Sequence, residues 1–375
     1  MDNPQDRTPV SVLTGFLGSG KTTLLNAWLA SPELSDAAVI VNEFGEIGID
    51  HSLIASSNDN TIELSTGCLC CTVRGDLVET LRDLTEKRAR GEVRPYKRLL
   101  IETTGLADPI PVIQALITFP VARVYRLARV ITVVDAVLGL DTIERHPEAL
   151  KQVAVADELI ISKTDLDASH LPDLRARLAT LNPGAPQRLV AEAGLLDSPD
   201  VYDPATKPEL VMQWLRADRY DEADDGKAAH AHDHHHEDQH SIRGGHNEAH
   251  EAGELGSRHQ HDINRHSKDI GSFCLTFDQP LHWEHVSAWL DALVMAHGAD
   301  LLRVKGVLDI VGQDRPIVVQ AVQRLFHPPV KLAAWPAGSH QSRIVFITRG
   351  LSRDFVSEVL DIIRRRKPTE NTCAL

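Results

Sequence analysis

"SVLTGFLGSGKTTLLN", residues 11–26, joins an apolar run to a helix-like run through a glycine-rich loop. The loop matches the pattern G-x-x-x-x-G-K-[ST] from Gly15 to Thr22. In such a loop the backbone N–H groups point at phosphate oxygens, and the following helix adds the partial positive charge of its N-terminus. The stretch therefore predicts a phosphate-binding loop, or P-loop, between a strand and a helix. A chance glycine turn is the alternative.

The side chains of this loop have expected roles. Lys21 is expected to reach the β- and γ-phosphates, and the hydroxyl of Thr22 is expected to bind Mg²⁺. The other predicted nucleotide contacts are Gly15, Gly18, Ser19, Gly20 and Thr23.

Strand-like and helix-like runs alternate from about residue 9 to residue 215. Runs rich in Val, Ile and Leu predict strands at 10–13, 38–41, 98–102, 129–134 and 158–162. Helical runs lie between them, including 21–30, 75–88 and 172–181. Such apolar strands are typical of a parallel sheet covered on both faces. The sequence therefore predicts an α/β fold with a mostly parallel, doubly wound sheet.

The last of these predicted strands ends in "SKTD", residues 162–165, which resembles the N-K-x-D guanine motif. There the Asp, here Asp165, accepts hydrogen bonds from guanine N1–H and the exocyclic amine, and the stem of Lys163 lies along the ring. Adenine offers no matching pair of donors, so the motif favours GTP. Ser162 departs from the pattern, which has Asn. A surface turn is the alternative.

"RLLIETTGLADP", residues 98–109, places Glu102 directly after a predicted strand. This position suits a carboxylate that orders Mg²⁺ through water or positions the attacking water. Gly105 would let the backbone approach the γ-phosphate. A carboxylate that caps the next helix is the alternative for Glu102.

"STGCLCCTV", residues 65–73, holds three of the five cysteines, Cys68, Cys70 and Cys71. Thiolates bind zinc and similar cations, and three of them leave one coordination position open. That arrangement suits a site that loads and unloads a metal. A helix expected to begin near residues 73–75 would lower the thiol pKa values. Buried structural cysteines and a redox pair of Cys68 with Cys71 are the alternatives.

The acidic loop "VNEFGEIGID", residues 41–50, follows the second predicted strand, where a GTPase switch segment would lie. Its acids could contact Mg²⁺ or orient water, and Glu43 or Glu46 could approach the thiolates as a fourth ligand. A solvated acidic loop is the alternative.

The net charge of −14, from 53 acidic and 39 basic side chains, argues against nucleic-acid and anionic-membrane binding. We see no signal peptide and no apolar run of 18 residues, so we expect a cytoplasmic protein without a membrane span. Cysteines stay reduced in that compartment, which favours metal or redox chemistry for the cluster.

Composition divides the chain into three regions. We expect a P-loop domain over 1–220, a linker over 221–269 and a smaller α+β domain over 270–375. The linker holds 11 of the 19 histidines together with 12 acidic residues, so we expect it to be disordered and to collect metal ions. An indifferent polar spacer is the alternative. In the last region, 273–277 and 342–348 alternate like strands, and 282–298 has helical spacing that ends at Gly298.

Together "GFLGSGKTTLLN", "NEFGEIGID", "GCLCCTVRGDL", "IETTGLADP" and "SKTD" resemble the CobW-like family of P-loop GTPases. "HGADLLRVKGVLDI", "VQRLFHPP" and "SRIVFITRG" resemble the C-terminal domain of that family. The resemblance implies a GTPase that carries a metal on Cys68, Cys70 and Cys71 and delivers it to a client metalloprotein, which the last domain would help to recognise.

The leading hypothesis is a GTP-hydrolysing zinc metallochaperone with Mg²⁺ at the nucleotide, in which Lys21, Glu102 and Glu43 serve hydrolysis. A cobalt chaperone for cobalamin synthesis and a nitrile hydratase activator are alternatives within the family, with Co²⁺ as the possible metal. A metal-buffering or sensing protein and a P-loop kinase or ATPase are alternatives outside it. A homo-oligomer is possible.

Overall fold

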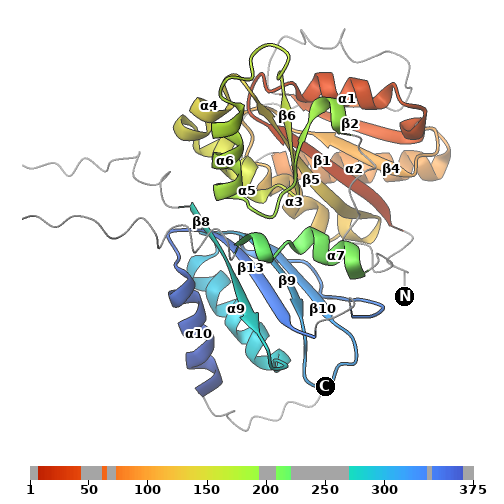
Figure 1. Cartoon of the computed structure of the whole chain (residues 1–375). Helices are drawn as coiled ribbons and strands as arrows, with labels where there is room; N and C mark the ends of the chain where they lie inside the picture. Colours follow the sequence, from red (N-terminus) through yellow and green to blue (C-terminus); the bar gives the residue numbers. More distant parts are fainter. Residues whose placement is uncertain are drawn as a thin grey trace, which may run out of the picture.

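The computed structural model describes residues 7–43, 61–65, 73–193, 208–220, 270–335 and 340–365. Within these ranges the chain builds two sheets, each with its own helices, that pack against each other (Figure 1). The expected linker, 221–269, lies outside the described residues.

The first sheet has seven strands, and every neighbouring pair is parallel. The five predicted strands are confirmed, and the parallel sheet confirms the predicted fold class. Two further strands at the sheet edges were not predicted. In spatial order the strands are β3 (Thr61–Ser65), β2 (Ala37–Glu43), β4 (Arg98–Glu102), β1 (Thr8–Gly15), β5 (Tyr125–Asp135), β6 (Glu158–Ser162) and β7 (Gln187–Leu189).

Helices cover both faces of this sheet, as the continuous apolar strands require. Successive residues of β1 show the division, because Val12 belongs to one apolar core and Leu13 to another. The Leu13 core includes Leu24 and Leu25 of the first helix. The helices are α1 (Lys21–Leu29), α2 (Val73–Arg90), α3 (Ile110–Ile117), α4 (Gly139–Arg145), α5 (Pro147–Val155), α6 (Leu171–Leu181) and α7 (Pro208–Leu215).

The second sheet is antiparallel, with two helices packed on one face. The predicted strands at 273–277 and 342–348 and the helix before Gly298 are confirmed. Its elements are β8 (Ile270–Phe277), α9 (Trp283–His297), β9 (Leu301–Leu308), β10 (Ile317–Val322), β11 (Leu325–Phe326), β12 (Val330–Lys331), β13 (Ser342–Arg349) and α10 (Arg353–Arg365).

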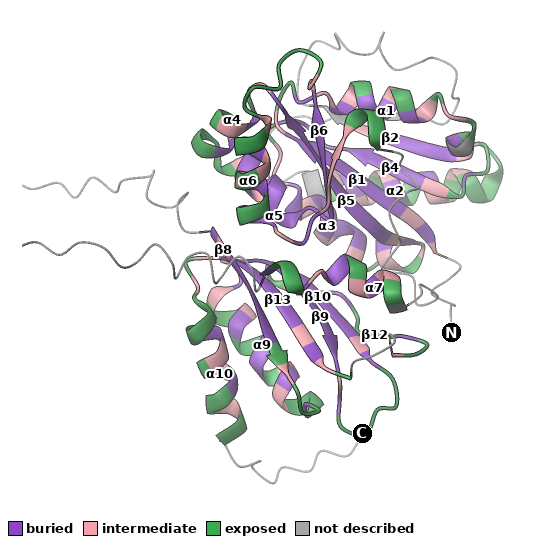
Figure 2. Ribbon diagram, viewed as in Figure 1, coloured by how far each residue is buried: buried purple, intermediate pink, exposed green. Residues whose placement is uncertain are grey.

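The other face of the second sheet packs on the first part, where α5 and α7 contact β9 and α6 contacts β8. The strands at this contact are mostly buried (Figure 2). Apolar residues of the second sheet, such as Leu302 and Val345, share one core with the first part. This contact also encloses charged groups.

Asp157, between α5 and β6, is the centre of that buried polar cluster. Its Oδ1 accepts hydrogen bonds from Trp214 Nε1 at 3.0 Å and Arg303 Nη2 at 2.6 Å, and lies 3.1 Å from Lys305 Nζ. Burial would raise the pKa of Asp157, but the two cations and the bonds from Trp214 and the Val130 N–H outweigh burial and hold the pKa at about 2. Asp157 is therefore a charged anchor between the two parts.

None of the helices in the described ranges is both long and apolar enough to cross a lipid bilayer.

Candidate functional site

The P-loop lies at the carboxyl ends of β1 and β4, where the chain leaves for opposite sides of the sheet. Open parallel sheets bind ligands at such a point. Gly15 has φ +144°, and a Cβ there would lie 2.3 Å from the carbonyl oxygen of Val133. Gly20, with φ +93°, precedes the first residue of α1. The predicted strand, loop and helix are confirmed.

Two side chains of the P-loop meet acidic or carbonyl oxygens. Lys21 is buried, and its Nζ donates to the carbonyl oxygen of Phe16 at 3.2 Å. The hydroxyl of Thr22 donates to Oε1 of Glu102 at 2.7 Å. The structure thus brings together Thr22 and Glu102, which the sequence placed 80 residues apart. Thr23, the next residue, is exposed.

Residues 103–108, here called the 103–108 loop, follow Glu102 and lie against the P-loop. Thr103 Oγ1 donates to Thr14 Oγ1 at 2.8 Å, which joins the ends of β4 and β1. A Cβ on Gly105 would lie 2.4 Å from the Cα of Leu17. Only glycine therefore fits at 105 without moving the P-loop backbone. The close backbone approach that the structure shows at Gly105 is to the P-loop, and the predicted approach to the γ-phosphate stays a prediction.

Ser162, the departure from the guanine motif, has a clear structural role. Its Oγ donates to the carbonyl oxygen of Ser19 at 2.6 Å and lies 3.3 Å from that of Val134. The side chain is buried. The short hydroxyl thus joins the end of β6 to the P-loop without the longer amide of Asn.

Lys163 and Asp165 differ in their surroundings. Lys163 has φ +59°, and its Nζ lies 2.7 Å from Oδ2 of Asp135 at the end of β5. Oδ1 of Asp135 accepts the N–H groups of Val137 and Leu138. This pairing holds the Lys163 stem across the end of the sheet. Asp165 is exposed, so its carboxylate is accessible for a base.

The predicted thiolate ligands Cys68, Cys70 and Cys71 lie outside the described residues, as does Glu46. The segments on either side are described, since β3 ends at Ser65 and α2 begins at Val73. The predicted start of this helix is confirmed. The backbone of Glu43 is the last position of β2 and pairs with Ser65. In the described ranges, no group of three or more His, Cys, Asp or Glu side chains could hold a metal ion.

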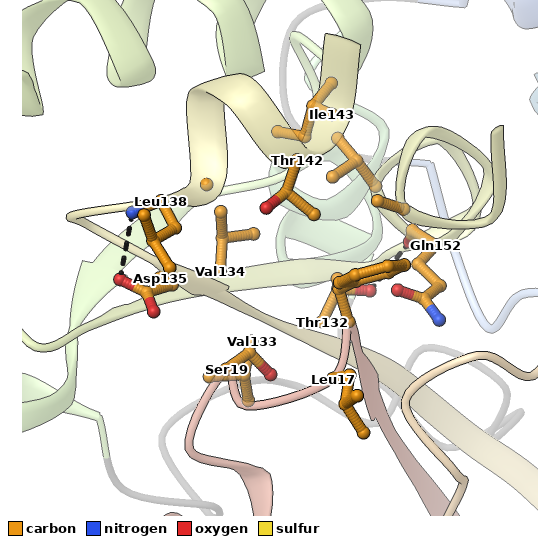
Figure 3. A pocket seen from close by; sticks show the side chains of 14 residues that line it. Leu17, Ser19, Thr132, Val133, Val134, Asp135, Leu138, Thr142, Ile143 and Gln152 are labelled. Atoms are coloured by element: carbon orange, nitrogen blue, oxygen red, sulfur yellow. Dashed lines mark hydrogen bonds between the residues drawn. The ribbon is translucent and has the colours of Figure 1, made fainter. Parts of the chain in front are cut away.

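A cavity of about 140 Å³ lies beside the P-loop, between the end of β5 and helices α4 and α5 (Figure 3). Ser19 and Leu17 line it from the P-loop, Asp135 from the end of β5, Leu138 from the residue before α4, and Gln152 from α5. Sequence reasoning missed Asp135 and Gln152. A predicted strand ending at residue 134 places an acid at 135 beside the P-loop strand, but no sequence signal identifies Gln152.

Two family models match the chain. The CobW/HypB/UreG nucleotide-binding domain matches residues 9–188, and the cobalamin synthesis protein CobW C-terminal domain matches residues 270–363.

Similar proteins agree with this match. The zinc chaperone YjiA of Escherichia coli K12 is 31% identical over 327 residues, with 84% of this chain and 86% of YjiA covered. The zinc chaperone CobW of Pseudomonas aeruginosa is 32% identical over 353 residues, with 85% and 82% covered. The crystal structure of Zn(II)-bound YjiA GTPase from E. coli superposes with a TM-score of 0.61 at 27% identity and covers 96% of this chain and 99% of that one. This chain therefore belongs to the CobW family of P-loop proteins.

Proposed function

We propose that the protein is a GTPase that carries Zn²⁺ on Cys68, Cys70 and Cys71 and passes it to a client metalloprotein. The observation that supports nucleotide binding is the 2.7 Å hydrogen bond between Thr22, at the end of the P-loop, and Glu102, at the end of β4. The hydroxyl of Thr22 in the first turn of α1 and the carboxylate of Glu102 beside it are hard oxygen groups of the kind that suit Mg²⁺. Thr22 and Glu102 would hold Mg²⁺ there, and the ion would supply positive charge that offsets the negative charge of the phosphates.

The chain's own residues divide the work on the nucleotide. Lys21 would exchange its carbonyl contact for the β- and γ-phosphates, since its Nζ already lies over the loop. Glu102 would orient water or Mg²⁺, with Glu43 as the second acid at a neighbouring strand end. Lys163 and Asp165 would hold guanine, and Ser162 would fix the distance between the base and the phosphates.

The metal half is supported by similarity and by donor chemistry. YjiA and CobW, the relatives described above, are named zinc chaperones. Three thiolates in four positions favour a borderline-soft cation such as Zn²⁺, and Co²⁺ is the alternative cargo. The cysteines follow β3, and β3 pairs with β2, whose last residue is Glu43. The pairing of Glu43 with Ser65, three residues before Cys68 in the sequence, supports a thiolate site that responds to the nucleotide.

The test measures both halves on the reduced full-length protein. We expect Mg²⁺-dependent hydrolysis of GTP in preference to ATP, and we expect Lys21→Ala to abolish it. We expect Cys70→Ser to remove one tightly bound Zn²⁺, while Cys274→Ala, a change at the buried cysteine of β8, retains that ion. Preference for ATP would favour a kinase or ATPase. Zinc held mainly by the 221–269 histidines, with no loss in Cys70→Ser, would favour metal buffering.

A further inference from the structure

Gln152 of α5 holds the 103–108 loop through both hydrogens of its side-chain amide. Nε2 donates to the carbonyl oxygen of Gly105 at 3.1 Å and to that of Ala107 at 3.0 Å. The Gln152 side chain is fully buried. Two backbone carbonyls of one loop are therefore fixed by a single nitrogen.

The loop is held from two sides at once. Gly105 touches the P-loop backbone at Leu17, so the Gln152 bond meets the loop at its tightest point. Further along, Lys151 Nζ forms an ion pair with Asp108 at 2.9 Å. Consecutive residues of α5 thus fix both the tip and the end of the 103–108 loop.

Helix α5 is itself held firmly on the sheet. Thr132 Oγ1 of β5 donates to the backbone carbonyl of Gln152 at 2.7 Å. At the end of the helix, the amide of Asn182 donates to the carbonyl oxygens of Val153 and Ala156 at 2.9 Å each. At its start, His146 stacks on Phe16 of the P-loop, with ring centroids 4.5 Å apart. A side chain on such a helix is well placed to fix a neighbouring backbone.

We propose that Gln152 is a positioning residue for GTP hydrolysis, acting through the 103–108 loop. The inference rests on the proposed GTPase function. Gln152 fixes the direction of the Gly105 carbonyl. Because the peptide unit is planar, the same bond fixes the direction of the Leu106 N–H. The loop begins directly after Glu102 in the sequence. In the proposed function Glu102 serves Mg²⁺ or the attacking water, so the loop that follows it would face the γ-phosphate. GDP lacks that phosphate, so Gln152 would act on GTP binding and hydrolysis and leave GDP binding unchanged.

A role limited to packing would give a different pattern. Gln152 lines the cavity beside the P-loop and ties α5 to the 103–108 loop, so its replacement could simply lower the stability of the domain (Figure 3). In that case the binding of GDP and of GTP would weaken together, in step with thermal stability. The ratio of GTP to GDP affinity therefore distinguishes a positioning role from a packing role.

The experiment compares the full-length protein with Gln152→Glu and Gln152→Leu. Glu keeps the shape of the side chain but has no amide hydrogens to donate. Gln187→Leu is the matched control, because Gln187 Nε2 donates to the carbonyl of Arg175, away from the 103–108 loop. The readouts are kcat and KM for GTP, affinities for GDP and for a non-hydrolysable GTP analogue, and the melting temperature.

For both Gln152 variants we expect kcat to fall between about 10- and 100-fold, the scale of a misplacement of about 1 Å. We also expect weaker binding of the GTP analogue, with GDP affinity within about twofold of wild type because GDP has no γ-phosphate for the 103–108 loop to meet. Unchanged kcat and analogue affinity, or equal weakening of GDP and analogue, would overturn the inference. If the wild-type protein does not hydrolyse GTP, the proposed function and the role of Gln152 in hydrolysis both fail, and the ratio of analogue to GDP affinity then shows only whether Gln152 positions the 103–108 loop for binding.

Discussion

Replacing Asp157 with asparagine should destabilise the protein by about 3 kcal/mol, because the change leaves two buried cations without their shared carboxylate. Arg303 and Lys305 are each 1% exposed, and both are within 3.1 Å of Oδ1 of Asp157. Burial lowers the pKa of Lys305 to about 8 even with Asp157 beside it. The interface therefore depends on this one carboxylate.

The magnitude comes from two considerations. The pKa of Asp157 is lowered from 3.8 to about 2, which corresponds to roughly 2 kcal/mol in favour of the charged form. Removing one partner from a buried ion pair costs about 3–5 kcal/mol in measured cases. Asparagine keeps the volume and one acceptor oxygen, so we expect a value between the two, about 3 kcal/mol.

Urea unfolding followed by circular dichroism measures this change. Asp218→Asn is the matched control, because Asp218 pairs with Arg343 across the same contact but is 80% exposed. We expect that control to change stability by less than about 1 kcal/mol. Adding Arg303→Met to Asp157→Asn should recover part of the loss. Equal stability of Asp157→Asn and wild type, or a larger loss in the double variant, would refute the reasoning.

Three further changes test other parts of the site and the fold. Burial beside Arg303 lowers the pKa of His327 from 6.5 to about 3. The unfolded chain therefore binds more protons than the folded chain between these pH values, and the free energy of unfolding should fall as pH drops from 6.5, by about 2 kcal/mol at pH 5. Urea titrations of His327→Gln should lack this loss. Ser162→Ala should weaken GTP binding about 5- to 10-fold by removing the bond to the P-loop, and equal affinity in nucleotide titrations would contradict that role. Thr22→Val should lower GTP hydrolysis at least about 100-fold and weaken its dependence on Mg²⁺ concentration, and a turnover rate near wild type would argue against Thr22 as a metal ligand.

The sequence alone predicted the parts of this fold that depend on local pattern. Apolar runs such as 129–134 mark strands because burial on both faces requires a continuous run of large apolar residues. The P-loop could be predicted because backbone geometry requires its glycines. At Gly15, for example, a Cβ would clash with the carbonyl oxygen of Val133. The short edge strands β3 and β7 lack long apolar runs, so nothing in their sequence separates them from loops.

Contacts between residues that are distant in the chain could not be predicted from the sequence. Asp157 and Arg303 are 146 positions apart, and neither belongs to a motif. Gln152 sits in an ordinary helix, and its partners are backbone carbonyls that any sequence would supply. The replacement of Asn by Ser162 shows the same limit, because the distance to the Ser19 carbonyl decides whether a short hydroxyl suffices.

In the proposed function, the nucleotide state controls a thiolate site for zinc. The most direct test is a competitive Zn²⁺ titration of the reduced full-length protein with a chromophoric chelator. It is run with Mg²⁺ and a non-hydrolysable GTP analogue, then with Mg²⁺ and GDP, and repeated on Cys70→Ser. Comparison with Cys70→Ser separates the thiolate site from the histidines of 221–269.

We predict that zinc affinity at the thiolate site differs at least about tenfold between the two nucleotide states, a coupling free energy of about 1.4 kcal/mol. A nucleotide can shift zinc binding only if it interacts differently with the zinc-bound and zinc-free states of the protein. We also predict that this difference disappears in Cys70→Ser. Equal zinc affinity with the GTP analogue and with GDP would contradict the account, since the nucleotide would then have no control over the metal.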